Sequence, residues 1–393
     1  MTRAMIEAVS TTLESGKLNQ WNNPVVGEFE RKFTRHIGCK HAVAVFNGTV
    51  ALELCIKALG LREGDEVIVT PRTFLASASC CAWYGINPVF ADVDESSQNI
   101  TLDAIKKAVT SRTKAVILVH LAGWPCDLED ICGYCREKGI YVIEDCAQAH
   151  GAKYKNKSVG TWGDINAWSF CQDKIITTGG EGGMVTTNCP RLYKLAWSIK
   201  DHGKGYDTTL KAQHPRGFRW LHDRIGTNWR MMPIQATIGV HALDALHEWV
   251  AHRREVARIY SEVLGRCAGV RVPQPPPEVY HSYYKYYFFL EPACFKISRD
   301  ALIARITEAG VFCQVGSCGE VYRERALAGF APERACKNAR KLFDTAILLR
   351  CDPTISMAVA RHTISVVKNI LLENIVECRP SLSLVREATP ASP

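Results

Sequence analysis

At 393 residues the chain is longer than one compact core usually holds, so we expect one large and one smaller domain. With 47% hydrophobic and 22% charged residues it is typical of an ordinary globular protein, and no apolar run is long enough to cross a membrane. The formal net charge of +8 suits an anionic partner, and the lack of a basic block with interleaved aromatic residues favours a phosphorylated small molecule over a nucleic acid.

The first segment, residues 1–25, is predicted to form an irregular arm. It lacks the apolar core of a secretory signal, so the 17 cysteines of the chain indicate reduced thiols in a cytoplasmic protein. Cys132 and Cys135 form a CxxC pair inside a helix-like segment that has no matching second pair. We interpret both as helix positions rather than as a redox or metal site.

Strand and helix patterns then alternate along the chain. Apolar runs predict strands over 41–46, 66–69, 88–93, 115–120 and 141–146, and helical spacing predicts helices over 27–38, 51–59, 71–78, 102–109 and 128–138. This alternation predicts an α/β protein with a mostly parallel sheet covered on both faces. In such sheets ligands gather at the carboxyl ends of the strands.

A small polar turn, Asn47-Gly48-Thr49, separates the first strand from its helix. The free N–H groups at the helix start, together with the Thr49 hydroxyl, would form an anion site. An ordinary capped turn is the alternative interpretation.

Asp145 closes an apolar strand, where a carboxylate is costly unless it is paired or hydrogen-bonded. A salt bridge or a helix cap would explain it structurally. The functional interpretation pairs it with a cationic ring nitrogen, as in a pyridoxal phosphate site, with Gln148 near the phenolic oxygen of the ring. The first strand-turn has no G-x-G-x-x-G pattern, which argues against a dinucleotide site.

One lysine, Lys174, follows the apolar run 167–171 and precedes a glycine-dense turn at 179–183. Lysine forms Schiff bases with aldehydes, and nearby glycines allow a ligand to approach the backbone closely. A lone lysine before such a turn is more often a solvated loop residue. Its place just past a predicted strand, like that of Thr49, Phe74 and Asp145, favours a shared site.

The second half of the chain is less regular. We expect a helix over 191–200, a long loop over 201–223, a long helix ending near 264, a strand over 283–290, a helix over 300–309, a possible strand over 311–315, and helices over 335–348 and 364–376. We therefore predict a large domain over residues 1–250, a small α/β domain over 251–378 and a flexible tail over 379–393.

With these pieces in place, the chain resembles the DegT/StrS-type sugar aminotransferases, pyridoxal-phosphate enzymes of the aspartate aminotransferase fold (fold type I). The likeness extends from about residue 27 to 372 and rests on segments at 27–30, 47–52, 64–68, 73–76, 88–93, 119–123, 144–151, 169–170 with Lys174, 180–183 and 228–231. Two segments depart from the family pattern: Cys-Gln-Asp at 171–173, and Gly-Ser-Cys-Gly at 316–319, where many members carry Arg, His and Tyr.

The resemblance implies roles for particular residues. Lys174 would hold the cofactor covalently and shuttle the proton, and Asp145 would keep the pyridine nitrogen protonated. The remaining cofactor contacts would come from Gly48, Thr49, Phe74, Gln148 and Ser169, with Asn228 reaching the phosphate from the neighbouring subunit of a homodimer. Arg230 would meet an anionic substrate group, although a structural ion pair explains it equally well.

The resemblance also implies a reaction: transfer of an amino group from glutamate to a nucleotide-linked keto sugar. The sequence of residues 176–184 looks more like that of members that aminate C4 of a 4-keto-6-deoxy sugar than that of members acting at C3, which implies lipopolysaccharide or other surface-glycan synthesis. A C3-keto sugar, a cyclitol ketone and a non-catalytic cofactor-binding regulator are the alternatives. No metal, membrane or nucleic acid is expected to take part.

Overall fold

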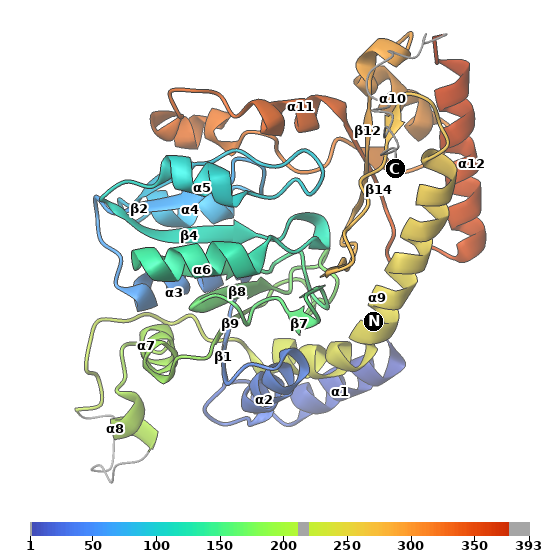
Figure 1. Ribbon diagram of the computed structural model, residues 1–393. Helices are drawn as coiled ribbons and strands as arrows, with labels where there is room; N and C mark the ends of the chain where they lie inside the picture. The colour runs from blue at the N-terminus through green and yellow to red at the C-terminus, as the bar shows by residue number, and fades with distance from the viewer. Residues whose placement is uncertain (1, 211–219, 377–393) are drawn as a thin grey trace, which may run out of the picture.

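The computed structural model describes residues 2–210 and 220–376 and contains a large sheet with helices on both faces (Figure 1). Seven strands follow the order β1-β9-β8-β5-β4-β2-β3. They are β1 (His41–Val45), β2 (Glu66–Val69), β3 (Asn87–Phe90), β4 (Thr113–Val119), β5 (Tyr141–Asp145), β8 (Ile165–Ser169) and β9 (Gly183–Thr187). Strand β9 runs antiparallel to β1 and β8, and the other neighbouring strands are parallel. The expected mostly parallel sheet is confirmed.

Helices before, between and after these strands confirm the predicted alternation. They are α2 (Val25–Ile37), α3 (Gly48–Leu59), α4 (Ala76–Ala82), α5 (Leu102–Ala108), α6 (Leu128–Lys138) and α7 (Pro190–Lys200). Left-handed glycines follow α2, α3 and α6, because glycine adopts a positive φ without a steric penalty. The helix expected over 71–78 begins only at Ala76, so Phe74 lies in the loop before it.

Alternate side chains of each central strand enter two different hydrophobic clusters. In β4, Ile117 packs with residues of α3, α4 and α7, whereas its neighbours Val116 and Leu118 pack with residues of α2, α5 and α6. A sheet buried on both faces in this way explains why its strands read as continuous apolar runs rather than as alternating ones.

The N-terminal segment differs from the expectation. Instead of an irregular arm, Arg3–Glu14 forms helix α1, capped by the Thr2 hydroxyl and packed on the long helix α9 (Pro233–Leu264). Met5 is its buried residue, and Thr12 hydrogen-bonds to Thr237 across the contact at 3.0 Å. A single buried side chain leaves almost no apolar periodicity, so the sequence pattern could not reveal the helix.

A second sheet, in the order β10-β12-β14-β13, occupies the C-terminal part of the chain. Its strands are β10 (Val270–Arg271), β12 (Tyr286–Leu290), β13 (Cys313–Gln314) and β14 (Ala346–Leu349), and its helices are α10 (Arg299–Glu308), α11 (Lys337–Thr345) and α12 (Met357–Glu373). The helix predicted over 335–348 is therefore wrong at its end, because the buried run 346–349 pairs with β12 and β13 instead of continuing α11.

Shorter elements complete the described chain. Strands β6 (Lys153–Tyr154), β7 (Lys157–Ser158) and β11 (Val279–Tyr280) form a small sheet, and α8 (Tyr206–Leu210) lies within the region expected to be a loop. No helix in the described ranges is long and apolar enough to cross a membrane.

The proposed domain division at residue 250 falls within α9. A separate hydrophobic cluster begins at Val256 and joins the end of α9 to α10, α12 and the second sheet. The boundary itself stays a prediction, and the tail over 379–393 lies outside the described residues.

The CxxC pair lies in α6, as expected, with Cys132 and Cys135 both buried and free. Burial raises the pKa of the Cys135 thiol to about 12, so it stays protonated near neutral pH. The pair therefore has the properties of helix core positions.

Candidate active site

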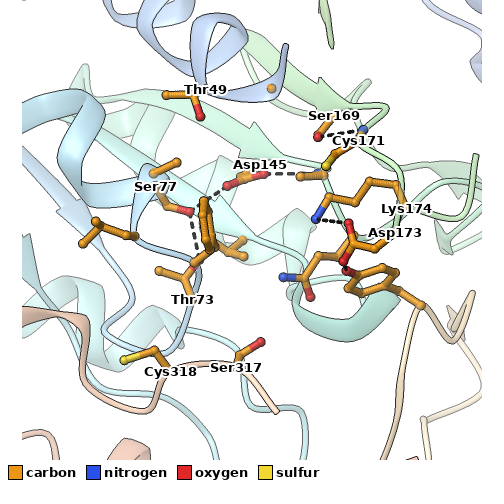
Figure 2. A pocket seen from close by; sticks show the side chains of 18 of the residues that line it. Thr49, Thr73, Ser77, Asp145, Ser169, Cys171, Asp173, Lys174, Ser317 and Cys318 are labelled. Atoms are coloured by element: carbon orange, nitrogen blue, oxygen red, sulfur yellow. Dashed lines mark hydrogen bonds and ion pairs between the residues drawn. The ribbon is translucent and has the colours of Figure 1, made fainter. Parts of the chain in front are cut away.

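A cavity of about 720 Å³ opens where the parallel strands end. Seven of the nine candidate site residues line it: Gly48, Thr49, Phe74, Asp145, Gln148, Ser169 and Lys174. Figure 2 shows Lys174, Asp145, Thr49 and Ser169 around a common space. The structure thus brings together residues that are up to 126 positions apart in the sequence, although their individual roles remain predictions.

Lys174 lies in the loop after β8, and its side chain is only 16% exposed. The amine Nζ is 3.6 Å from Oδ1 of Asp173 and 5.0 Å from the centre of the Tyr284 ring. The Tyr284 hydroxyl donates a hydrogen bond to the other oxygen of Asp173. Lys174 is therefore a pocket residue with defined neighbours, not a solvated loop lysine.

Asp145 is the last residue of β5 and is 5% exposed. Its Oδ2 accepts a hydrogen bond from the Ser77 hydroxyl at 2.8 Å, and its Oδ1 accepts one from the Ala147 N–H at 3.1 Å. Burial raises the pKa of this carboxyl, although both hydrogen bonds and the charge of Lys174 oppose the rise. In the described parts of the chain this buried acid has no ion-pair partner in direct contact, and its direct polar contacts are these two hydrogen bonds.

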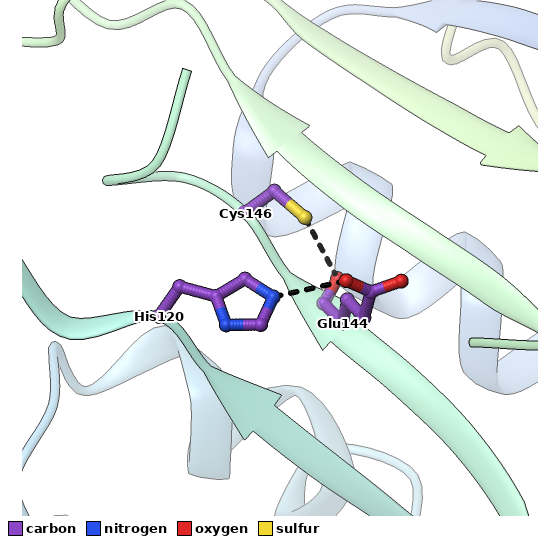
Figure 3. A group of neighbouring side chains, drawn as sticks. All are labelled: His120, Glu144 and Cys146. Carbon is purple, nitrogen blue, oxygen red and sulfur yellow. Dashed lines mark hydrogen bonds and ion pairs between the residues drawn. The ribbon is translucent and has the colours of Figure 1, made fainter. Parts of the chain in front are cut away.

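The residues beside Asp145 fix the end of its strand. Glu144 accepts a hydrogen bond from His120 Nε2 at 3.0 Å and others from the backbone N–H groups of residues 160, 162 and 163 (Figure 3). The Cys146 thiol points to the Glu144 carbonyl oxygen. Burial opposes ionisation of Glu144, but these bonds lower its pKa overall. Although His120, Glu144 and Cys146 lie close enough for a metal group, this hydrogen bonding gives them a structural role.

The start of α3 forms the opposite wall of the pocket. The Asn47 side chain accepts a hydrogen bond from the Val50 N–H at 2.9 Å. The N–H groups before Val50 have no helical partners, because the first turn of a helix offers them no acceptor. A side chain at Gly48 would place its Cβ 2.5 Å from the Cβ of Ser169, so only glycine permits this approach. Backbone N–H groups and the Thr49 and Ser169 hydroxyls therefore border a cradle that suits a phosphate.

Two further residues shape the walls. Phe74 is 68% exposed although it is aromatic, and its ring borders the cavity. Gln148 uses Oε1 to accept the Ala122 N–H at 2.8 Å, so its Nε2 remains to donate into the pocket.

Several lining residues were not identified from the sequence. Ser77, Tyr284, Lys285, Ser317 and Cys318 all border the cavity. Ser77 stands four residues after Thr73 and bonds to its hydroxyl at 2.8 Å, a helical spacing that could have signalled it. Tyr284 and Lys285 were hidden in a run that we read only as a strand, and residues 317–318 approach from far along the chain.

Asn228 and Arg230 do not line this cavity. The Arg230 guanidinium donates to Oδ1 of the buried Asp201 at 2.7 Å, which is the structural ion pair that the sequence left open. Asn228 is exposed, and its backbone pairs with that of Asp201. Contacts of either residue with a substrate or with a second subunit stay predictions.

The arrangement fits pyridoxal phosphate on features of the protein itself. Asp145 is a buried carboxylate without a cationic partner in the described chain, and a protonated ring nitrogen would supply one. The cradle at Gly48 would accept the phosphate, and the Lys174 amine would meet the aldehyde.

Comparisons with known proteins agree with this chemistry. The model of the DegT/DnrJ/EryC1/StrS aminotransferase family matches residues 1–368. GDP-perosamine synthase from Escherichia coli O157:H7 is 40% identical over 278 residues, 71% of this chain and 72% of that protein. The UDP-N-acetyl-3-dehydro-alpha-D-glucosamine 3-aminotransferase of Acidithiobacillus ferrooxidans is 35% identical and covers 70% of this chain and 69% of its own.

The fold comparison gives the same result. The crystal structure of an aminotransferase from Psychrobacter cryohalolentis superposes with a TM-score of 0.93 at 41% sequence identity, covering 95% of this chain and 98% of that one. The fold expected from the resemblance is therefore confirmed.

Proposed function

Because the chain belongs to the DegT/DnrJ/EryC1/StrS family of pyridoxal-phosphate-dependent sugar aminotransferases, we propose that it moves an amino group from glutamate to a nucleotide-linked keto-deoxy sugar. The observation that carries the proposal is the meeting of Lys174 and the unpaired, buried Asp145 in one cavity beside a phosphate-sized cradle. No single one of these features would support it.

The bound cofactor supplies an aldehyde for a lysine and a ring that withdraws electrons from the bonds at the reacting carbon. Lys174 would hold that aldehyde and, once released, would carry a proton on Nζ. The Asp145 carboxylate would keep the ring nitrogen protonated, and the hydrogen bonds from Ser77 and Ala147 would hold it in place. Gly48, Thr49 and Ser169 would bind the phosphate.

Two residues would orient the ring. Phe74 presents an exposed aromatic face to the cavity, and Nε2 of Gln148 would donate to the phenolic oxygen. We further propose a homodimer in which Asn228 of one subunit completes the phosphate contacts of the other. Its exposure and its absence from the cavity of its own chain support that arrangement.

We propose C4 of a 4-keto-6-deoxy sugar as the acceptor carbon, in lipopolysaccharide or other surface-glycan synthesis in the cytoplasm, where free thiols stay reduced. The sequence of residues 176–184 supports C4, and the net charge of +8 suits a nucleotide diphosphate. A C3-keto sugar is the second candidate, because a 35% identical relative is named as a 3-aminotransferase.

The test is an assay of purified holoenzyme with glutamate and a panel of GDP-, dTDP- and UDP-linked 3-keto and 4-keto sugars. Amination of a 4-keto-6-deoxy sugar is the expected result, and selective amination at C3 would replace the C4 proposal. If glutamate fails to change the visible absorption band of the cofactor and no other amino donor does so, the chain is a regulator and not a transaminase.

A further inference from the structure

Asp173 directly precedes Lys174 in the sequence and contacts two side chains that line the cavity. Its carboxylate lies between the Lys174 amine, 3.6 Å from Oδ1, and the Tyr284 hydroxyl, which donates to Oδ2. Tyr284 precedes β12, far along the chain, and its ring lies 5.0 Å from the same amine. The Lys174 amine therefore lies between side chains from two segments that are far apart in the sequence. Figure 2 shows Asp173 beside Lys174.

These contacts contribute little to the fold. The Asp173 side chain is 54% exposed, and an ion pair so accessible to water adds little to stability. At 3.6 Å the amine is also farther from the carboxylate than in a tight charge-assisted hydrogen bond. The contact thus attracts Lys174 without immobilising it, which is what a lysine that changes its bonding partner requires.

We propose that Asp173 is a positioning residue for the Lys174 amine. This inference rests on the proposed role of Lys174. Whenever the lysine is not bonded to the cofactor, Asp173 holds its ammonium form in the pocket, with Tyr284 fixing the carboxylate.

The other charged and titratable groups around Lys174 do not duplicate this role. Asp145 already bonds to Ser77 and Ala147, and burial lowers the pKa of His150 to about 3, so this ring is neutral. Glu181 borders the cavity with its carboxylate near the Cys171 thiol, and Lys285 is a like charge. Burial opposes ionisation of Asp173, but Lys174, Tyr284 and Lys285 lower its pKa overall, so the carboxylate is charged at neutral pH.

The test measures the reactivity of Lys174 in the full-length protein after removal of the cofactor. A trace of acetic anhydride at pH 7.5 acetylates only neutral amines, and mass spectrometry of the peptide with Lys174 gives the rate. Loss of one unit charge at this distance in a solvated pocket should raise the rate in Asp173→Asn about fivefold.

Three variants separate charge from structure. Asp173→Glu retains the charge and should label at nearly the wild-type rate. Tyr284→Phe frees the carboxylate but keeps its charge, so it should raise the rate by about twofold at most, less than Asp173→Asn does. Glu181→Gln removes an acid from the same cavity without touching Lys174 and should leave the rate unchanged. The melting temperature of each cofactor-free variant reports whether the variant keeps its fold.

A wild-type rate in Asp173→Asn would overturn the proposal, and so would equal acceleration in Glu181→Gln. The experiment uses neither cofactor nor sugar, so its failure is distinct from a failure of the proposed reaction. That reaction is tested separately by the keto-sugar panel.

Discussion

At the scale of single residues, the site is organised around a carboxylate placed where a charge is unfavourable. Burial raises the pKa of Asp145, so the folded chain retains a proton there at pH values where the unfolded chain has released it. The contribution of Asp145 to stability therefore falls as the pH rises from the ordinary carboxyl pKa through the raised one. A cationic ring nitrogen beside Asp145 would offset this loss of folding stability, which the buried charge causes in the cofactor-free protein.

Asp145→Asn should consequently stabilise the cofactor-free protein while impairing the enzyme. We expect its melting temperature at pH 7.5 to rise by about 1–3 °C, and the gain to vanish at acidic pH, where Asp145 is protonated as well. Turnover should drop on the order of 100-fold, because asparagine cannot hold the ring nitrogen protonated. Calorimetry of both apoproteins across pH checks the first part. A variant that is less stable at pH 7.5 would contradict the argument.

At the scale of elements, the strand ends and the start of α3 determine the site. The sequence located these pieces well, because apolar strand runs and a polar turn are local patterns: the turn at Asn47, Asp145 at the end of β5 and Lys174 after β8 lie as expected. Pieces that depend on packing of distant segments were missed. Strand β14 looked like a helix, and Tyr284 and residues 317–318 reach the cavity only through the tertiary fold.

Gly48→Ala tests the cradle formed by α3. The added methyl group would lie 2.5 Å from the Cβ of Ser169, so the helix start and Ser169 must separate. We expect the dissociation constant of the cofactor to rise about tenfold or more, with a loss of about 1–3 kcal/mol in stability. Equilibrium titration of the apoprotein with pyridoxal phosphate measures the affinity.

Gly133→Ala is the matched control. Gly133 lies inside α6 with no atom within 4 Å of the added Cβ, so alanine should stabilise that helix by up to about 1 kcal/mol and leave the affinity unchanged. If Gly48→Ala binds the cofactor as the wild type does, the helix start is not the phosphate site.

At the scale of the whole molecule, the cavity of one chain contains the lysine, the acid and the cradle but lacks Asn228. A dimer with shared sites would supply it from the second subunit. Subunit exchange between two variants distinguishes this arrangement from a site complete within one chain. When the two changed residues belong to sites shared between subunits, a mixed dimer contains one site with neither change.

We expect Lys174→Ala and Asn228→Ala to be inactive or strongly impaired alone. Mixed after reversible dissociation, they should recover about a quarter of the wild-type activity, because half of the dimers are mixed and each has one intact site. Activity measured against mixing ratio checks this. No recovery, despite mixed dimers seen by native mass spectrometry, would place Asn228 in the site of its own chain or outside any site.

The covalent role of Lys174 is tested most directly by reducing the holoenzyme with borohydride, digesting it and locating the cofactor mass by tandem mass spectrometry. The cofactor should be found on the peptide that contains Lys174 and should be absent from Lys174→Ala. Finding it instead on Lys285, which also lines the cavity, or on no lysine at all would contradict the assignment of the site.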